Sequence, residues 1–382
     1  MKIVIAPDSF KGSLTSKDAT QAIYKGFNKI MPDASYTLMP MADGGDGTVD
    51  VLVATRNGTL HSMQVKGPYL EPVEAKYGLS IDGDSAAIEV AETSGLQYIN
   101  PSTVDPLATN TFGFGELIIK LLDQGIKRIY MGLGGSATND GGIGMAAALG
   151  VKFYDVRHHE LEPIPYNLRD IEFVDITGID LRIAQTEMIV ISDVENPLLG
   201  DNGATFVYGR QKGLTTENQL VRADYAMEKY AQAVAKVCDH HNPDEPGAGA
   251  AGGLGFALLA FTNATRQSGA EFLMRVSGFT QAVSDADVVV VGEGSLDNLT
   301  HFGKSPFAVA TQAKRVNPQA MVVGLAAHIG DVEALYEAGV DAVFSILPGV
   351  QTLEVAIDKA SYNLEATAES VARLIKATHK AD

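Results

Sequence analysis

The chain of 382 residues has a single cysteine, no tryptophan and few cationic residues for its length. Cys238 alone can form neither an intramolecular disulfide nor a thiolate-rich metal site. The 29 Lys and Arg against 47 Asp and Glu give a formal net charge of −18. Because this charge repels phosphate backbones over long range, we expect no nucleic-acid partner. Small anions can still bind where glycine amides, a few lysines or Mg²⁺ neutralise them.

Long hydrophobic runs are also missing. No stretch of eighteen uncharged apolar residues occurs, so we expect no membrane partner. The N-terminal MKIVIAPDS turns polar too early for a signal peptide, which makes the cytoplasm the expected location. The sequence leaves open whether the chain forms a homo-oligomer.

The two ends of the chain share one pattern of strands and helices. The first segment reads as the strand MKIVIA, a loop, a helix over residues 17–30 and the strand SYTLMPMA. The last hundred residues alternate the strands DVVVVG, MVVGLAA and AVFSIL with helices. Continuous β-branched strands between amphipathic helices indicate a parallel sheet that is covered on both faces. We therefore predict a doubly wound α/β domain formed by residues 1–65 and 281–382.

The middle of the chain, residues 66–280, predicts a second α/β domain inserted into the first. It contains alternating strands such as EAKYGLS and AAIEVAE and long helices over residues 112–123 and 222–239. The chain is also too long for one ordinary hydrophobic core. Two domains imply a cleft in which a ligand can bind.

The first candidate site follows the first strand, because ligands of open parallel sheets bind at the carboxyl ends of the strands. Asp8, Ser9 and Lys11 precede a helix for which Thr15 and Asp18 fit a capping box. A carboxylate, a hydroxyl and an ammonium beside a helix N-terminus can hold an oxyanion. Ordinary turn and capping chemistry is the alternative.

The second candidate site is the turn MADGGDGT, in which Asp43 and Asp46 bracket two glycines. Glycines let the backbone approach a ligand, and two carboxylates three residues apart can share a cation or a polyol. An acidic glycine turn with a purely structural role remains the alternative.

The third candidate site is GLGGSATNDGG, residues 132–142, which follows a strand and precedes a helix. This order forms a nest of backbone N–H groups suited to phosphate, although the GK[ST] of a Walker A loop is missing. The candidate residues of this loop are Gly134, Gly135, Ser136, Thr138, Asn139 and Asp140. A second glycine-rich loop, GAGAAGGLG, contains Gly252 and Gly253 and is ambiguous, since tight helix packing also selects Gly and Ala.

Two further strands end in acidic residues. One is followed by Asp193 and Asn196, and the other by Glu293, Asp297, Thr300 and Lys304. Carboxylates in such positions can hold Mg²⁺ or take a proton from a hydroxyl nucleophile, and a lysine can neutralise a transferring phosphoryl group. Together with the phosphate-type loops, they favour an enzyme.

Several blocks, in this order, resemble the bacterial type I glycerate kinase family: APDSFKGSL, PMADGGDGT, GLGGSATNDGGIGMAAALG, DVENPLLG, RQKG, GAGAAGGLG and GEGSLDNLTHFGKSP. The resemblance extends from Met1 to about Ile346. It implies a kinase that uses ATP and Mg²⁺ to phosphorylate D-glycerate, usually at the 2-hydroxyl to give 2-phosphoglycerate. It also implies a flavodoxin-like domain formed by both chain ends, with the second α/β domain inserted and the substrates in the cleft.

The matched blocks assign the candidate residues to roles. The substrate side comprises Asp8, Ser9, Lys11, Asp43, Asp46, Asn196, Glu293 and Thr300. The ATP side comprises Gly134, Gly135, Ser136, Thr138, Asn139, Asp140, Lys212, Gly252 and Gly253. Catalysis falls to Asp193, Asp297 and Lys304, and the metal to Asp193 and Asp297, without a decision on which aspartate is the base.

Two positions depart from the family pattern. Ser295 stands where the family usually has the arginine of GEGRLD, and Arg210 stands where it often has the proline of FGPQKG. The Ser295 departure favours, as an alternative, a kinase for another small hydroxy acid or polyol. A catalytically silent sensor of a small acid is the alternative from a different class. The presence of both the phosphate-type loops and the carboxylates argues against it.

Overall fold

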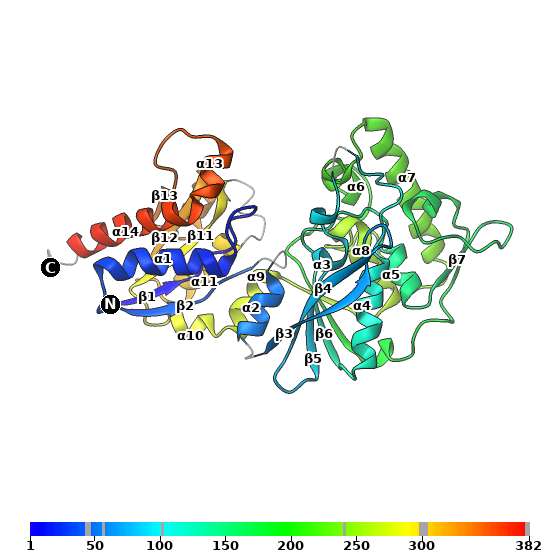
Figure 1. Ribbon diagram of the computed structural model, residues 1–382, viewed down its shortest axis with the longest axis horizontal. Helices are drawn as coiled ribbons and strands as arrows, with labels where there is room; N and C mark the ends of the chain where they lie inside the picture. The colour runs from blue at the N-terminus through cyan, green and yellow to red at the C-terminus, as the bar shows by residue number, and fades with distance from the viewer. Residues whose placement is uncertain (43–46, 56–57, 101–102, 240–241, 298–304, 379–382) are drawn as a thin grey trace. The chain divides into compact units, whose positions relative to one another are not determined.

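The fold is that of a computed structural model, which describes residues 1–42, 47–55, 58–100, 103–239, 242–297 and 305–378. The chain divides into two compact units, and each has its own sheet (Figure 1). Unit 1 comprises Met1–Asp43 and Ser268–Asp382, and unit 2 comprises Gly44–Gln267. The α/β class expected from the sequence is confirmed in both units.

Unit 1 contains a five-stranded parallel sheet with the order β13-β12-β11-β1-β2. Counted along the chain within this unit, the order is 2-1-3-4-5, which is that of flavodoxin-like doubly wound sheets. The strands are β1 Lys2–Ile5, β2 Ser35–Leu38, β11 Val288–Leu296, β12 Met321–Ile329 and β13 Ala342–Ser345. The helices are α1 Ser16–Ile30, α9 Gly269–Val276, α10 Phe279–Val283, α11 Ser305–Val316, α12 Glu333–Glu337, α13 Leu353–Asp358 and α14 Ala360–Thr378.

The run of valines in β11 explains why this sheet is covered on both faces. Val288 and Val290 pack with α1 and α14, which lie side by side on one face (Figure 1). Val289 and Val291 pack with residues of α9 to α12 on the other face. Because successive side chains of a strand point to opposite faces, a continuous apolar run requires a cover on each side.

Unit 2 is built on a mixed six-stranded sheet with the order β10-β9-β6-β5-β4-β3. Its strands are β3 Thr59–Lys66, β4 Pro72–Leu79, β5 Ser85–Glu89, β6 Arg128–Gly132, β9 Glu187–Ile191 and β10 Thr265–Gln267, beside a separate pair of β7 Lys152–Tyr154 and β8 Phe173–Asp175. The α-helices are α2 Thr48–Thr55, α3 Val90–Ser94, α4 Phe112–Asp123, α5 Ile143–Ala148, α6 Ala204–Tyr208, α7 Glu217–Val234 and α8 Ala250–Phe261. Short 3₁₀ helices are η1 Leu96–Tyr98, η2 Pro165–Asp170, η3 Ile183–Gln185 and η4 Arg210–Lys212.

The border between the units differs from the expected one. Residues 44–65 were expected in the domain of the chain ends, but β3 pairs along its whole length with β4. Antiparallel strands that follow each other in the chain can be joined by a short connection, as β3 and β4 are. For this reason, β3 belongs to the sheet of unit 2. Residues 268–280, expected in the inserted domain, group with unit 1.

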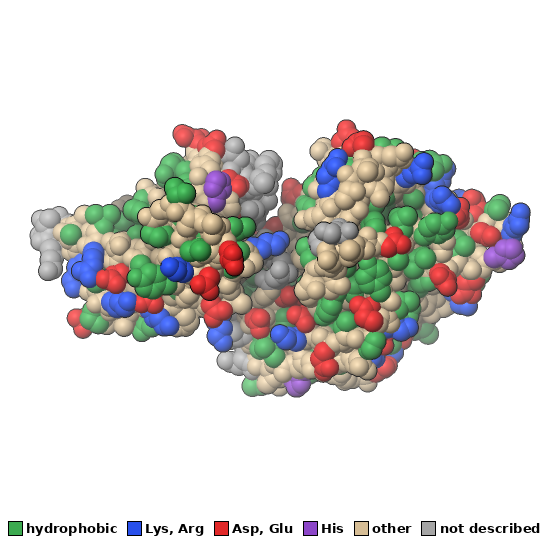
Figure 2. Space-filling model, turned by 45° about the horizontal axis from the view of Figure 1, so that its top comes forward, with side chains coloured by type: hydrophobic (Ala, Val, Ile, Leu, Met, Phe, Trp, Pro, Cys, Tyr) green, Lys and Arg blue, Asp and Glu red, His purple; other side chains and the backbone are tan. Residues whose placement is uncertain are grey.

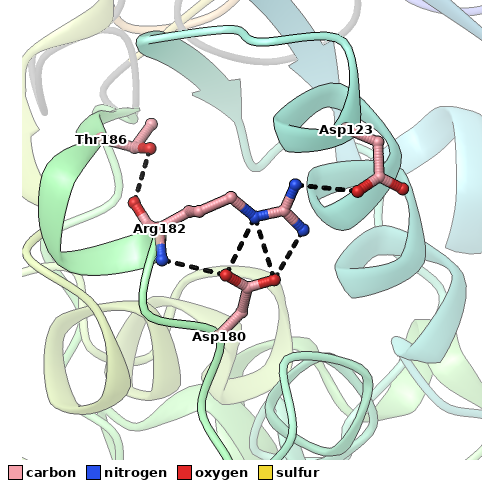
Figure 3. Close-up of polar contacts among 4 residues, drawn as sticks. All are labelled: Asp123, Asp180, Arg182 and Thr186. Atoms are coloured by element: carbon pink, nitrogen blue, oxygen red, sulfur yellow. Dashed lines mark hydrogen bonds and ion pairs between the residues drawn. The ribbon is translucent and has the colours of Figure 1, made fainter.

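An exposed ion-pair cluster fastens the end of α4 to the segment before β9 (Figure 3). Arg182 Nη2 donates to Asp180 Oδ2 at 2.6 Å, and Arg182 Nη1 donates to Asp123 Oδ1 at 2.8 Å. Thr186 Oγ1 donates to the carbonyl oxygen of Arg182 at 2.8 Å.

On the face that Figure 2 shows, acidic, basic and hydrophobic side chains are interspersed. None of the helices in the described part of the chain combines the length and the hydropathy that a membrane span requires.

Candidate functional site

In unit 1, the candidate residues gather at the carboxyl ends of β1 and β11. The Asp8 backbone N–H donates to the Gly292 carbonyl at 2.8 Å, which continues the pairing of the two strands. The Asp8 carboxylate accepts hydrogen bonds from the Ser9 backbone N–H and from Ser305 Oγ, each at 2.6 Å. Asp8 is 5% exposed and Ser305 is fully buried. A carboxylate is therefore held at the start of α11, where the helix dipole favours negative charge.

Ser305 was not among the residues chosen from the sequence. The signal was present, because a serine directly before a proline at the start of an amphipathic stretch is typical of a helix N-terminus. Its partner Asp8, however, lies 297 residues earlier in the chain. Only the parallel pairing of β1 with β11 brings the two together.

The end of β11 carries the second part of this site. Glu293 is 8% exposed, and Ser295 Oγ donates to Asp297 Oδ2 at 2.8 Å. Gly294 lies against the opposite loop, since a Cβ added there would be 3.5 Å from the Lys11 backbone nitrogen. Lys11 itself is exposed. Unit 1 thus brings an exposed ammonium and buried or half-buried carboxylates to one edge of its sheet.

The described residues do not include four of the candidate site residues, which are Asp43, Asp46, Thr300 and Lys304. The roles assigned to them remain predictions from the sequence.

In unit 2, the candidate loop joins β6 to α5 and is organised by a buried aspartate. The Asp140 carboxylate is fully buried and accepts four hydrogen bonds. Two come from the backbone N–H and hydroxyl of Thr111, each at 2.8 Å, and two from the amides of Gly142 and Gly144, at 2.9 and 3.2 Å. Burial raises the pKa of Asp140, against the opposite effect of these donors.

Asp140 changes the interpretation of the loop as a phosphate nest. The amides of Gly142 and Gly144 at the start of α5 donate to its carboxylate, so a phosphate there would have to displace it. Gly134 and Gly135 are half-buried and form the accessible part of the loop. Gly135 has a φ of 71°, a conformation that glycine adopts without strain.

The two glycine-rich loops of unit 2 pack against each other, backbone to backbone. The Gly141 N–H donates to the Gly252 carbonyl at 2.9 Å. A Cβ at Gly252 would overlap the carbonyl oxygen of Thr138, and one at Gly253 would lie 2.8 Å from Gly141 Cα. Both glycines are buried and have left-handed backbones, with φ values of 68° and 91°. Close packing therefore accounts for the glycines of the second loop.

Lys212, in η4, contacts the loop of residues 132–142 from a distant part of the sequence. Its side chain is almost completely enclosed, with the residue 2% exposed. Lys212 Nζ donates to Ser136 Oγ at 2.9 Å and to the Thr138 carbonyl at 2.7 Å. Burial lowers the pKa of Lys212 to about 7, although the nearby charge of Asp140 raises it. Lys212 is therefore positioned to act on the loop itself.

Asn139 and Thr138 complete this polar cluster. Asn139 Nδ2 donates to Thr205 Oγ1, in α6, at 3.0 Å. Within the described part of the chain, Asn139 Oδ1 and Thr138 Oγ1 are buried without a hydrogen-bond partner. Unpaired buried acceptors are uncommon in proteins and often mark a site for water or a ligand.

Asp193 and Asn196 lie beyond the carboxyl end of β9. Asp193 is half-buried. Both ends of the Asn196 amide are used within unit 2, since its Oδ1 accepts from Tyr208 Oη at 2.8 Å and its Nδ2 donates to the Asn202 carbonyl at 2.9 Å. The Asn196 side chain therefore fixes the loop around it.

Arg266 is a residue of this region that the sequence interpretation missed. It lies on β10, and its Nη1 donates to the Ser192 carbonyl at 3.2 Å and, at 3.5 Å, to the Val194 carbonyl. Its guanidinium also pairs with Glu195 at 3.8 Å. The backbone on both sides of Asp193 is thereby held. No local pattern predicts this contact, because it joins residues more than seventy positions apart.

A metal centre of protein ligands alone does not occur in the described part of the chain, where no three histidine, cysteine, aspartate or glutamate side chains are grouped closely enough. Single carboxylates such as Asp193 and Asp297 are the donors that Mg²⁺ takes, together with phosphate oxygens of a substrate. The metal role assigned to Asp193 and Asp297 remains a prediction from the sequence.

Comparisons with known proteins agree over nearly the whole chain. The model of the Glycerate kinase family matches residues 3–376. A protein named glycerate kinase from Bacillus subtilis is 43% identical over 377 residues, which is 98% of each chain. One named glycerate 2-kinase from Escherichia coli is 42% identical over 375 residues, covering 96% of this chain and 98% of its own.

A crystal structure shows the same similarity. The structure of a Salmonella typhimurium LT2 protein assigned as glycerate kinase 2 superposes with a TM-score of 0.83 at 43% identity, and covers 100% of this chain and 99% of its own. The match spans the glycine-rich loops, the acidic strand ends and the sheets that carry them. On these findings, the chain belongs to the glycerate kinase family.

Proposed function

We propose that this protein transfers the γ-phosphoryl group of ATP to D-glycerate, with the 2-hydroxyl as the acceptor, and releases 2-phosphoglycerate and ADP. The observation that carries the proposal is membership of the glycerate kinase family over residues 3–376. The relative named glycerate 2-kinase supports the choice of hydroxyl. The cytoplasm, which supplies ATP, is the proposed location.

Substrate binding falls to the sheet edge of unit 1. Glycerate is a three-carbon acid with two hydroxyls, so a specific site pairs its carboxylate with a cation and its hydroxyls with acceptors. Lys11 is an exposed cation at this edge, and Asp8 and Glu293 are acceptors beside it. We assign these three residues to glycerate, and Gly134, Gly135 and Ser136 of unit 2 to ATP.

Proton transfer falls to Asp193 or Asp297. A carboxylate that takes the proton of the attacking hydroxyl, with charge neutralisation around the phosphoryl group, is what this reaction requires. Ser295 Oγ orients the Asp297 carboxylate, and Arg266 fixes the backbone around Asp193. Mg²⁺, when bound, would neutralise phosphate charge, and the aspartate that does not take the proton would help to hold it.

Ser295 supports one alternative, a kinase for another small hydroxy acid. Its hydroxyl bonds to Asp297, where the family pattern usually has an arginine. A cation that could hold a substrate carboxylate is thus absent from this position. This substitution therefore affects the choice of the acceptor substrate more than that of the phosphoryl donor.

The decisive experiment is an ADP-release assay with Mg²⁺ and ATP on D-glycerate, L-glycerate, glycolate, tartronate and glycerol, followed by ³¹P NMR of the product. Turnover with D-glycerate and a signal from the 2-phosphate would support the proposal. Turnover with another acceptor alone would move the assignment to the alternative. Absence of ADP release with every acceptor would contradict glycerate as the substrate and would favour a different acceptor or the catalytically silent sensor.

A further inference from the structure

The burial of Lys212 is costly. The ammonium donates to two neutral acceptors, Ser136 Oγ and the Thr138 carbonyl, and the carboxylate of Asp140 acts on it without a hydrogen bond. Buried charges that lack a directly bonded counterion are strongly disfavoured. A methionine of similar length would fill the same volume without this desolvation. Stability alone therefore does not explain a lysine here.

The contacts of Lys212 act on one short segment, residues 136–140. From one side, η4 and the preceding α6 hold this segment through Lys212 and through Thr205, which accepts from Asn139. From the other side, Thr111 donates to Asp140. The segment directly follows Gly134 and Gly135, the accessible part of the loop. Its position therefore determines where those two glycines lie.

Lys212 is 2% exposed, and two of the three N–H donors of its ammonium are used within the protein. A direct contact with a ligand would require these bonds to break. The sequence block RQKG suggested a ligand-binding role for Lys212, and these contacts favour an indirect one.

We propose that Lys212 is a positioning residue, which holds Ser136 and the Thr138 carbonyl so that the glycine loop keeps the shape that receives the phosphoryl donor. This inference rests on the proposed function for its catalytic consequence. Its structural consequence, an ordered loop at residues 132–142, can be measured without any activity.

The first test is amide hydrogen exchange of the free protein, with mass spectrometry of peptides that cover residues 132–142. Lys212→Met is expected to accelerate exchange in this segment about 10-fold or more, while peptides from α4 and β5 keep their rates. Arg210→Met is the matched control, because it removes a cation from the same 3₁₀ turn. Arg210 is exposed and bonds to the Thr215 carbonyl and to Glu217.

The second test is steady-state kinetics with ATP and D-glycerate. Lys212→Met is expected to raise the KM for ATP about 10-fold and to leave the KM for glycerate within about twofold, since the loop belongs to the ATP side. Ser136→Ala removes only one of the two bonds and is expected to have a smaller effect of the same kind. The double variant is expected to be no worse than Lys212→Met, because the two residues act through one contact.

Several results would overturn the proposal. Unchanged exchange and an unchanged KM for ATP in Lys212→Met would do so, as would equal losses in Arg210→Met, which would assign the effect to the turn. If Lys212→Met does not fold, hydrogen exchange of Ser136→Ala tests the proposal instead. Lys212→Gln and Ser136→Ala would then be combined, and additive losses of exchange protection in the two variants would contradict the proposal. A wild-type protein inactive on glycerate would contradict the proposed function, while the exchange result would still decide the role of Lys212.

Discussion

Asp8 in unit 1 and Asp140 in unit 2 occupy comparable places and do different work. Each follows a parallel strand, and each accepts hydrogen bonds at the start of a helix. Asp140 is fully buried and accepts four hydrogen bonds, whereas Asp8 is 5% exposed and precedes the half-buried Ser9 and the exposed Lys11 in the chain. The enclosed carboxylate of Asp140 holds a loop together, whereas Asp8 is the carboxylate that we propose for substrate binding. The same sequence signal therefore precedes both a structural aspartate and a proposed binding aspartate.

The largest effect is expected from Asp140→Ala. The change leaves the buried donors of Thr111, Gly142 and Gly144 unpaired, at about 1–3 kcal/mol for each donor. We expect a loss of about 3 kcal/mol or more in the free energy of unfolding, and a Tm lower by roughly 6 °C or more. Thermal unfolding followed by circular dichroism measures this. A Tm within about 2 °C of wild type would break the comparison.

The next largest effect is expected on catalysis from Asp193→Asn and Asp297→Asn, one residue from each unit. Loss of a general base costs on the order of 10²-fold or more in kcat, which is about 3 kcal/mol of transition-state stabilisation. Glu195→Gln is the control, because Glu195 is close in sequence but its side chain is 77% exposed. If both asparagine variants keep near wild-type kcat, the assignment of the base is wrong.

Asp8→Ala tests the aspartate of unit 1 in the same comparison. The hydroxyl of Ser305 can rotate to another acceptor, so we expect a loss of only about 1 kcal/mol in stability. The KM for glycerate is expected to rise about 10-fold, because an acceptor for a substrate hydroxyl is removed. Kinetics and thermal unfolding of the same preparation separate the two effects. A stability loss equal to that of Asp140→Ala would assign Asp8 to construction.

Lys212 predicts a pH dependence of stability. Its pKa is about 7 in the folded protein, against an ordinary value of 10.5. Between these values the unfolded chain binds more protons, so this group makes the protein more stable as pH rises, by about 1 kcal/mol per pH unit. Urea unfolding of wild type and Lys212→Met at pH 7, 8 and 9 measures the difference. Parallel curves for the two proteins would show that Lys212 does not titrate in this range.

The smallest effect is expected at the cluster of Arg182, Asp180 and Asp123, which Figure 3 shows. These side chains are partly or largely exposed, and exposed ion pairs contribute about 0–1 kcal/mol. Asp123→Ala is therefore expected to change the free energy of unfolding by less than about 1 kcal/mol in urea unfolding. If Asp123→Ala lost as much free energy of unfolding as Asp140→Ala, the number of hydrogen-bond donors, and not their burial, would determine the contribution of a carboxylate to stability.

Much of the local structure could be predicted from periodicity. The helix expected over residues 112–123 has those bounds, and the five strands of unit 1 follow one another as expected, although α9, α10 and α13 were not predicted. The helix expected over residues 222–239 instead runs from Glu217 to Val234. Its start is set by a capping box of Thr216 and Gln219, ahead of the residues that show the apolar period.

The sequence alone determined the elements, the carboxyl-end positions of the candidate residues and the family, because these depend on neighbours along the chain or on ordered blocks of residues. Tertiary structure alone decided which glycines pack and which remain accessible, and it brought Ser305 to Asp8 and Lys212 to Ser136. These contacts join residues 297 and 76 positions apart. Burial and the pairing of buried donors are properties of such long-range contacts, so no local pattern specifies them.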